Sequence, residues 1–600
     1  MELVVPPSMK YNVVAPEEYI KIQRETIANL ESFWASQALQ LSWKKLWDKV
    51  LTGNGPRARW FEGGTLSPYF NVVGKHALGE TANKPALIEE DEEGTSFIAS
   101  YRELDLFARS IAKTFRELGV SSRDWVLIYA PSSIEAVSTA LASMMLGAPV
   151  EFVFTGFGWW ELRRRIKNRR PKAIVAFDSL TRRGKRISLL ENLKRALENV
   201  DVKPEVFVVE KLRSSPKEWR SFDELLEKTS LTEESVVESS HPLLGFHIGY
   251  EESFKPLTHG VGGYLTQTVS ITRWLGLRSR DTLFCTVGLG WITAVSHCFI
   301  GALSVGSTIL VYTGAPDYPD WGRWLELIDY YSATVFLTTS SALRLILKKT
   351  DVKDRELDSL KMIVTTGEPM EESLWWNAYL KLGSGSSPLI DSIPSKTGRI
   401  PVFNMYIQTE IGSFATGNLP SSAFAPIAPG SAGLPLLGLA VDVTDESCAS
   451  LRGEWGRLVL SKPWPALPVE SPEEFERSWN GDCYDTGDRA LMNELGYIYI
   501  KGRRDTVIKA SGYRLSPGAI EFALEEIGVT RRAVVFGVPD EERFEVIAVA
   551  TEGGEPSFIK KAVRELIGPI AEPSLVLQLE GFKGDKKSLR RELREKSVMR

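Results

Sequence analysis

Short apolar runs alternate with amphipathic helical stretches along the middle of the chain. Helices are predicted over residues 101–119 and 133–146, and buried strands over 125–129 and 150–154. Further apolar runs of the same kind occur at 173–177, 206–209, 307–312, 334–338 and 361–365. Short apolar runs separated by helices are typical of parallel strands that are buried on both faces. The pattern therefore predicts an α/β fold.

A different pattern begins near residue 430. Short strands with turns are predicted at 456–460 and 496–500, and from Thr506 the chain has the pattern of a small α+β unit. That unit has a hairpin-like start, a helix over 517–526, a strand over 532–538 and a basic, helical end. A stretch at 383–397, rich in Ser, Gly and Pro, is expected to be an inserted surface loop.

The N-terminal segment has many aromatic residues in an otherwise polar sequence, among them Trp34, Trp43, Trp47 and Trp60. Rings at this density more often pack a chain segment onto a domain than form a ligand cage. The expected organisation is an aromatic-rich segment packed on the large domain (1–98), the large domain (99–503), a hinge (504–506) and a C-terminal domain (507–600).

The composition is that of an ordinary globular protein. Of the 600 residues, 43% are hydrophobic and 25% are charged, which excludes a disordered, collagen-like or coiled-coil chain. The net charge of −5 gives no whole-chain signature of nucleic-acid binding. No signal peptide is recognised, and the most apolar windows are interrupted by Glu151 and His297. We expect a cytoplasmic protein without a membrane span, and leave a homo-oligomer open.

The cysteines are Cys285, Cys298, Cys448 and Cys483, with no CxxC spacing among them. They are too few for a disulfide framework, and with five histidines a structural zinc site is not expected. We expect reduced, buried thiols.

Small, polar and charged residues follow several of the predicted strands. They form short segments at 365–369, 407–412, 484–488, 501–505 with 509–514, and 583–591. Taken singly, each is explained by a turn, a surface loop or a solvated basic helix. Open α/β sheets, however, place ligand sites at the carboxyl ends of their strands. Together and in this order, the segments predict a ligand site.

These segments, with TrpPheGluGlyGlyThrLeu at 60–66 and CysThrValGlyLeuGlyTrpIleThr at 285–293, resemble the motifs of the adenylate-forming acyl-CoA synthetases. The chain is most similar to the acetyl-CoA and propionyl-CoA synthetase branch, nearly from end to end. The resemblance implies a large N-terminal adenylate-forming domain and a small mobile C-terminal α+β domain. It also implies formation of an acyl-adenylate from a carboxylate and MgATP, followed by transfer of the acyl group to coenzyme A.

The resemblance assigns the nucleotide site residue by residue. The adenine site would be lined by Gly367, Glu368 and Pro369, and Asn404 would stand at the start of the strand leading to the phosphate residues. The ribose would be bound by Asp488 with Arg503 beside it, and the α-phosphate by Gln408 and Thr409. Glu410 would hold Mg²⁺, and Lys587 takes the place of the adenylation lysine. A compact point charge such as a lysine ammonium suits the space between carboxylate and phosphate oxygens.

The remaining assignments concern the second half-reaction and the acyl group. Asp505 matches the hinge position. The surface for thioester formation would include Ser511, Gly512 and Arg514. Arg514 would also belong to the nucleotide site. The CoA 3′-phosphate would be bound by Arg182 and Lys185. The acyl pocket would be formed by Trp291, Ile292, Thr293, Thr366 and Ile407.

The clearest departure from the family is the phosphate loop. A Ser/Thr/Gly run ending in Lys-Pro-Lys-Gly is replaced by HisIleGlyTyrGluGluSerPheLysProLeuThrHisGly at 247–260, where only Gly249, Ser253, Lys255 and Pro256 match. Glu251 and Glu252 stand where a triphosphate needs hydrogen-bond donors, and like charges at this distance repel. Either ATP is held differently in this chain, or adenylation is weak or absent.

Further departures affect the pocket and the lysine. Asn404 replaces an Asp, Ile407 replaces a Trp that closes the acetate pocket, and valines are replaced by Ile292 and Thr366. The pocket is therefore remodelled, with propionate, butyrate, branched acids, and hydroxy or keto acids all open. Because Lys586 replaces a glycine, the reacting lysine is either Lys586 or Lys587.

The sequence thus predicts an AMP-forming acid–CoA ligase for a short- or medium-chain carboxylate. The alternative is a catalytically impaired paralogue that binds nucleotide, acyl-CoA or a partner subunit. A third hypothesis is an adenylating enzyme that uses the pantetheine of a carrier protein, against which the Arg182 and Lys185 pair argues.

Overall fold

The computed structural model describes residues 2–6, 9, 13–211, 216–226, 233–249, 254–352, 357–382, 400–504, 507–510, 513–579, 581 and 585–598, with the backbone only at Ala510, Lys587 and Val598. Several predicted features lie outside the described residues. They are Ser253 with Glu251 and Glu252 of the phosphate loop, the insertion at 383–397, Asp505 of the hinge, and Ser511 and Gly512.

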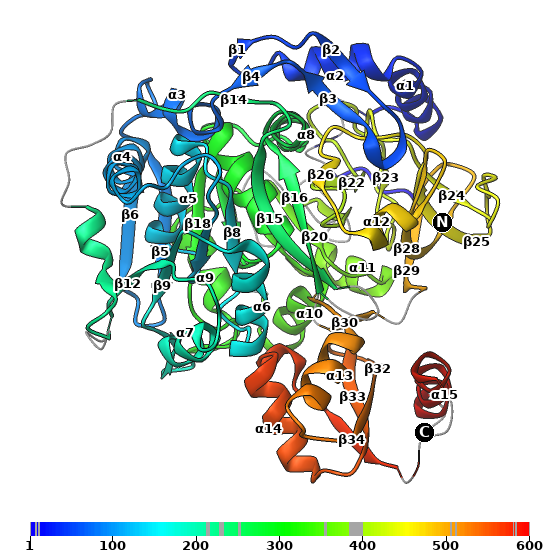
Figure 1. Cartoon of the computed structure of the whole chain (residues 1–600). Helices are drawn as coiled ribbons and strands as arrows, with labels where there is room; N and C mark the ends of the chain where they lie inside the picture. Colours follow the sequence, from blue (N-terminus) through cyan, green and yellow to red (C-terminus); the bar gives the residue numbers. More distant parts are fainter. Residues whose placement is uncertain are drawn as a thin grey trace.

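Two large, mainly parallel sheets form the centre of the described chain (Figure 1). One has the order β13-β12-β9-β7-β8-β15-β16-β26. Its strands are β13 (Arg220–Ser221), β12 (Glu205–Val209), β9 (Ala173–Phe177), β7 (Val126–Tyr129), β8 (Val150–Val153), β15 (Pro242–Gly249), β16 (Phe254–Gly260) and β26 (Pro468–Glu470). The pairing is parallel from β13 to β15 and antiparallel from β15 to β26.

The second large sheet has the order β23-β22-β21-β20-β19-β17-β18-β5-β6. Its strands are β23 (Leu434–Pro435), β22 (Phe414–Gly417), β21 (Val402–Ile407), β20 (Met362–Thr366), β19 (Val335–Thr339), β17 (Thr282–Cys285), β18 (Thr308–Tyr312), β5 (Pro85–Glu90) and β6 (Ser96–Ser100). The run from β21 to β5 is parallel throughout. The predicted parallel α/β sheet is therefore confirmed.

Helices cover and separate these sheets. They are α4 (Tyr101–Glu117), α5 (Ile134–Leu146), α6 (Trp159–Arg169), α7 (Leu190–Leu197), α8 (Val261–Trp274), α9 (Arg323–Tyr330), α10 (Ser340–Lys349), α11 (Glu372–Lys381) and α12 (Glu473–Arg477). Helix α4 begins at a capping box in which Ser100 and Glu103 satisfy each other's backbone N–H groups. Helix α5 is buried on every side from Ala136 to Leu146, because it carries almost no charged residues.

The N-terminal segment packs on the large domain through α1 (Pro16–Ala28), α2 (Leu30–Ala38), and the short strands β1 (Trp43–Lys45), β2 (Lys49–Thr52), β3 (Arg59–Glu62) and β4 (Thr65–Leu66). The Tyr19 hydroxyl donates to the Pro435 carbonyl at 2.9 Å, and the Trp34 indole N–H donates to the Gly438 carbonyl at 2.9 Å. The tryptophans of this segment thus bury rings in a core shared with the large domain.

The C-terminal part has its own elements and its own core. It begins with the hairpin β30 (Ile508–Ala510) and β31 (Tyr513–Leu515), and the sheet β32 (Arg532–Asp540), β33 (Phe544–Glu552) and β34 (Leu575–Gln578) follows. Its helices are α13 (Pro517–Glu526), α14 (Pro556–Leu566) and α15 (Lys586–Val598). Figure 1 shows this part, orange to red, below the large domain, with α15 on its outer flank. The antiparallel sheet β24 (Val441–Thr444), β25 (Trp455–Leu460), β28 (Cys483–Met492), β27 (Trp479–Asn480) and β29 (Ile498–Arg503) precedes it.

One prediction about the cysteines is wrong. Cys285, at the end of β17, and Cys298 form a disulfide, with Cα atoms 6.3 Å apart, whereas Cys448 and Cys483 are free. The intervening segment folds back after β17, so that the helix over Ala294–Ala302 brings Cys298 against the strand. The spacing of the two cysteines in the sequence does not reveal that the chain folds back in this way. No helix in the described ranges is both long enough and apolar enough to cross a membrane.

Candidate active site

The carboxyl ends of four adjacent parallel strands open into one cavity of about 1850 Å³. Its floor includes the last residues of β17, β19, β20 and β21, which are Cys285, Thr339, Thr366 and Ile407. Because β19 pairs with both β17 and β20, and β20 with β21, these residues lie side by side. The C-terminal domain closes the opposite wall with Lys509, Tyr513 and Arg514, among others.

Most of the predicted site residues line this cavity. They are Arg182, Lys185, Gly249, Trp291, Ile292, Thr293, Thr366, Gly367, Ile407, Gln408, Thr409, Asp488, Arg503 and Arg514. Five others do not line it: Lys255, Glu368, Pro369, Asn404 and Glu410. The structure therefore brings together residues that are widely separated in the sequence, from Arg182 to Arg514.

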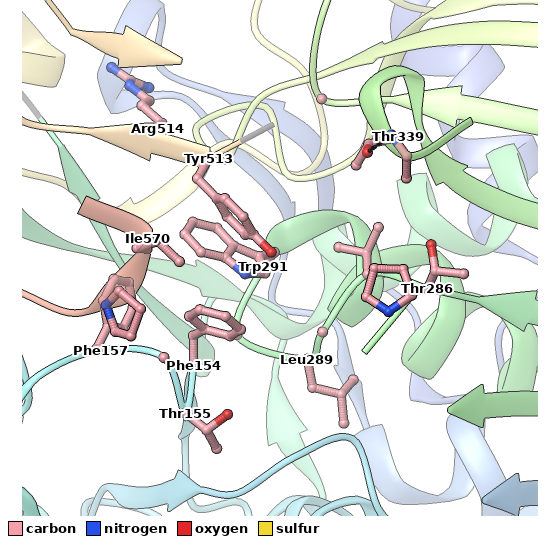
Figure 2. Close-up of a pocket in the computed structure, with 18 of the residues that line it drawn as sticks. Phe154, Thr155, Phe157, Thr286, Leu289, Trp291, Thr339, Tyr513, Arg514 and Ile570 are labelled. Carbon is pink, nitrogen blue, oxygen red and sulfur yellow. Dashed lines mark hydrogen bonds between the residues drawn. The ribbon is translucent and has the colours of Figure 1, made fainter. Parts of the chain in front are cut away.

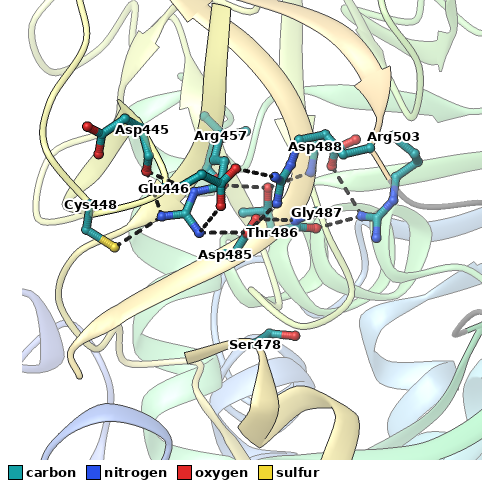
Figure 3. Close-up of polar contacts among 12 residues, drawn as sticks. Asp445, Glu446, Cys448, Arg457, Ser478, Asp485, Thr486, Gly487, Asp488 and Arg503 are labelled. Atoms are coloured by element: carbon teal, nitrogen blue, oxygen red, sulfur yellow. Dashed lines mark hydrogen bonds and ion pairs between the residues drawn. The ribbon is translucent and has the colours of Figure 1, made fainter. Parts of the chain in front are cut away.

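Asp488 is positioned by a tight turn within β28 (Figure 3). The Asp485 carboxylate accepts the backbone N–H of Gly487 at 2.8 Å, and the Thr486 hydroxyl accepts that of Asp488 at 3.2 Å. Gly487 has φ +75°, and a Cβ there would lie 2.4 Å from the Arg503 guanidinium. Only glycine therefore allows Arg503 to lie against the turn.

The Asp488 carboxylate is buried but charged. Lys509 donates to one oxygen at 3.1 Å and Tyr406 to the other at 2.8 Å, while Arg503 lies 3.5 Å away. Burial alone would raise the pKa of Asp488, but the positive charges of Lys509 and Arg503 outweigh it and lower the pKa to about 2. Sequence analysis placed Lys509 within a motif but did not single it out as a partner, and missed Tyr406.

The segment that follows β21 contains Gln408, Thr409 and Glu410. It is held by hydrogen bonds to both the large domain and the C-terminal domain. The Gln408 amide donates to the Thr486 carbonyl at 2.8 Å and accepts from the Tyr484 hydroxyl at 3.1 Å. Glu410 is 1% exposed, and one of its oxygens accepts from Arg514 of the C-terminal domain at 2.7 Å. Its second oxygen has no hydrogen-bond partner among the described residues. The chain thus places a buried carboxylate three residues after this strand, with one oxygen paired to the C-terminal domain and the other unpartnered within the described chain.

The segment after β20 turns sharply at Gly367, whose φ is +88°. Glu368 does not line the cavity; one of its oxygens accepts the backbone N–H of Ser341, and burial raises its pKa. Asn404 lies in the middle of β21, accepting from Thr365 at 3.4 Å and donating to the Ser431 carbonyl at 3.3 Å. Asn404 thus makes bonds within the sheet instead of facing the cavity.

The divergent phosphate-loop segment continues two antiparallel strands. Gly249 ends β15 opposite Phe254 of β16, and Lys255 lies opposite Ile248. Lys255 forms an ion pair with Glu474 at 3.7 Å, so its charge is directed to the edge of the sheet. The described part of this segment is therefore a hairpin stem.

An aromatic cluster lines the cavity and includes rings from both domains (Figure 2). The Tyr513 ring lies 4.6 Å from that of Trp291 and 5.6 Å from that of Phe154. Phe157 completes the cluster at 5.8 Å from Trp291. Phe154 follows β8 and Tyr513 begins β31, and sequence analysis singled out neither. For Phe154, the sequence signal that could have indicated a role in the site is an aromatic residue directly after a buried strand.

Arg182 and Lys185 stand at the tip of the hairpin β10 (Ser179–Arg182) and β11 (Lys185–Ser188), on the cavity rim. Both backbone N–H groups of the turn, at Arg183 and Gly184, donate to the Glu92 carboxylate, at 2.8 and 2.9 Å. The Arg183 side chain pairs with Asp317 at 2.9 Å. The turn is thus anchored, and the two predicted cations beside it line the cavity.

Helix α15 lies away from the cavity. Lys586 donates to Glu525 at 2.7 Å and lies 3.4 Å from Glu521, both on α13. Lys587 belongs to α15, but its side chain is outside the description. No described residue of α15 lines the cavity.

Comparison with known proteins matches residues 75–244 and 255–467 to the AMP-binding enzyme family, and residues 19–72 to the acetyl-coenzyme A synthetase N-terminus. The first match leaves out 245–254, which contains the first part of the divergent loop, including Glu251 and Glu252. Acetyl-coenzyme A synthetase of Pyrobaculum aerophilum is 32% identical, covering 93% of this chain and 87% of the relative. 3-Hydroxypropionyl-coenzyme A synthetase of Metallosphaera sedula is also 32% identical, over 94% and 88%.

Among solved structures, acetoacetyl-CoA synthetase from Streptomyces lividans matches with a TM-score of 0.74 at 22% identity, covering 93% of this chain and 86% of that one. This likeness shows the adenylate-forming fold. The chain belongs to the AMP-binding enzyme family, in its acetyl-CoA synthetase-like branch. The predicted class, an AMP-forming acyl-CoA ligase that uses ATP, Mg²⁺ and CoA, is confirmed.

Proposed function

We propose that the chain activates a short-chain carboxylate as its acyl-adenylate and transfers the acyl group to coenzyme A in the cytoplasm. One observation carries the proposal: a single cavity joins Asp488, Gln408 and Thr409 to the predicted acyl pocket and to the Arg182–Lys185 rim. A carboxylate oxygen would attack the α-phosphorus of ATP and release pyrophosphate. The CoA thiolate would then attack the acyl carbon and release AMP.

Asp488 is suited to bind the ribose. A carboxylate offers about four acceptor positions, so ribose hydroxyls can share it with Tyr406 and Lys509. Its pKa, lowered to about 2, keeps it ionised at neutral pH. Thr409 and the Gln408 segment lie next to it on the cavity wall, where the α-phosphate would follow the ribose.

Glu410 fits the predicted Mg²⁺. Its unpartnered buried oxygen is a hard donor, and Mg²⁺ is usually held by one or two carboxylates together with phosphate oxygens and water. When bound, Mg²⁺ neutralises charge on the phosphate oxygens. Among the described residues no group of three or more His, Cys, Asp or Glu side chains could hold a metal, so ATP itself would complete the ligand set.

For the reacting lysine we favour Lys587. Lys586 is paired with Glu525 and Glu521 of its own domain and would have to break both contacts to enter the cavity. With α15 away from the cavity and Tyr513 inside it, the described domain arrangement fits the second half-reaction. Rotation of the C-terminal domain would bring α15 in for adenylation.

The alternative, a catalytically impaired paralogue, rests on Glu251 and Glu252, which lie outside the described residues. The comparisons give it no support. Retention of Asp488, Gln408 and Thr409 in one cavity supports the ligase.

The test is pyrophosphate release from MgATP by the purified protein with acetate, propionate, butyrate, isobutyrate and 3-hydroxypropionate, with and without CoA. We expect release that depends on one or a few of these acids. Acid-independent or absent release, together with measurable AMP or acyl-CoA binding, would instead establish the impaired paralogue.

A further inference from the structure

The disulfide between Cys285 and Cys298 closes a loop that forms part of the cavity wall. Every residue from 285 to 293 lines the cavity, and the predicted acyl-pocket residues at 291–293 are among them. Cys285 ends β17, and Cys298 lies 13 residues later, in the helix over Ala294–Ala302. The bond therefore joins the two elements that flank this wall segment.

Few hydrogen bonds hold the wall segment in place. In the described structure a single hydrogen bond joins residues 287–293 to the chain outside 285–298, where the Leu289 N–H donates to the Ser132 hydroxyl at 3.1 Å. The segment also contains two glycines, Gly288 and Gly290. Segments with few hydrogen bonds to the rest of a fold open at a low cost in free energy. The covalent bond at its base is therefore important for keeping the wall in position.

The disulfide lies between the cavity and the core. Cys285 is 3% and Cys298 is 2% exposed, and both line another, small void of about 10 Å³ whose wall includes Val287 and Leu289. Reduction leaves two thiols that cannot stay at bonding distance, so the two sulfur atoms must separate. Because Val287 and Leu289 line the same void, this movement acts on the wall segment.

The other two cysteines provide an internal comparison. Cys448 and Cys483 are free, and neither lines the cavity. In the cytoplasm, which is the proposed location, disulfides are usually transient and redox-sensing. A disulfide at the base of the acyl-pocket wall is placed to make carboxylate binding depend on the redox state.

We propose that the Cys285–Cys298 pair is a redox-sensitive device that controls carboxylate binding. With the disulfide formed, residues 286–293 are held as the wall of the acyl pocket. A dithiol reductant transfers two electrons and two protons, which gives two cysteine thiols and the cyclic disulfide of the reductant, and the wall segment loosens. The inference rests on the proposed function, because it takes this cavity as the acyl-activating site.

The test compares the purified protein before and after treatment with dithiothreitol. Thiols counted in denaturant should number two before treatment and four after it. In ATP–pyrophosphate exchange, which needs no CoA thiol, reduction should raise the KM for the best carboxylate about fivefold or more and leave the KM for ATP nearly unchanged. Amide hydrogen exchange over 286–293 should become faster, and oxidised glutathione should reverse both effects.

Two variants separate the disulfide from other effects of the reagent. Cys298→Ala should show the raised KM without treatment and no response to dithiothreitol. The double variant Cys448→Ala with Cys483→Ala is the matched control and should respond as the unmodified protein does.

Three outcomes would overturn the proposal: four thiols before treatment, an unchanged KM for the acid after reduction, or equal loss of every kinetic parameter with loss of the near-UV circular dichroism. The last would show that the bond only stabilises the fold. Absence of exchange with every acid, while reduction still speeds hydrogen exchange over 286–293, would instead overturn the proposed function, so the two failures are distinguishable.

Discussion

Lys586 and Lys587 are neighbours in α15 with different expected roles. Removing Lys586 takes away its contacts to Glu525 and Glu521, which should lower the free energy of unfolding by about 1 kcal/mol and leave adenylation nearly unchanged. Lys587→Ala should reduce pyrophosphate release by about a hundredfold or more, because a positioned charge at the reacting phosphate is lost. Thioester formation from supplied acyl-adenylate should survive in both variants.

Pyrophosphate release and thioester formation are measured separately for each variant, with thermal unfolding alongside. If Lys586→Ala loses adenylation and Lys587→Ala does not, the reacting lysine is Lys586. Loss of both half-reactions in Lys587→Ala would contradict a role confined to adenylation.

The role of Asp488 was inferred from the resemblance of Tyr-Asp-Thr-Gly-Asp to a family motif and stays a prediction. The local structure of the motif is compact, because the residues that shape its turn are within three positions of Asp488. The charges around Asp488 were harder to predict from the sequence, because Lys509 comes from another domain. For Asn404 the resemblance implied a place with the nucleotide residues, which stays a prediction. In the structure Asn404 bonds to Thr365 and Ser431 and does not line the cavity.

At the scale of elements, the β10–β11 hairpin carries a prediction of its own. Because Glu92 and Asp317 hold the turn, replacing both Arg182 and Lys185 by Ala should leave the hairpin folded. The KM for CoA should rise about tenfold or more, since two cations facing a phosphate are lost, whereas CoA-independent pyrophosphate release should not change. Steady-state kinetics with varied CoA measures the first effect.

The control for the hairpin is Arg170→Ala, which removes an exposed arginine paired with Asp201 outside the cavity. Its KM for CoA should equal that of the unmodified protein. Equal loss of both half-reactions in the double variant would show that the hairpin supports the whole site instead of CoA binding.

Elements were predicted well where the apolar pattern is local. Strands such as β9 and β12 have the predicted bounds to within one residue, because uninterrupted apolar runs between helices admit few other structures. The hairpin stem of β15 and β16 was not predicted, since a phosphate loop was expected from 247 onward. The disulfide was missed for a similar reason: it depends on how the chain returns after β17.

At the scale of the whole molecule, the two domains meet through side chains that no local pattern connects. Lys509 reaches Asp488, Arg514 reaches Glu410, and Trp160 of α6 donates to Glu526 of α13 at 3.0 Å. The first two contacts involve residues proposed to bind ribose and Mg²⁺. Substrate binding and domain position should therefore be coupled, because the same carboxylates serve both.

The histidines give the molecule a predictable response to acid. Burial lowers the pKa of His76, His247 and His259 to about 4 and that of His297 to about 3. Between pH 6.5 and 4 the unfolded chain therefore binds more protons than the native one, so the free energy of unfolding should fall as the pH is lowered. Burial also raises the pKa of three carboxyl groups, that of Glu89 to about 8 and those of Glu368 and Glu234, and these groups oppose the histidines in part. The net loss of unfolding free energy from pH 7 to pH 5 should be on the order of a few kcal/mol, with a net uptake of protons on unfolding at pH 5.5. Calorimetry in buffers of different ionisation enthalpy measures both quantities, and a melting temperature that stays constant or rises over this range would show that these histidines are not buried in their neutral form.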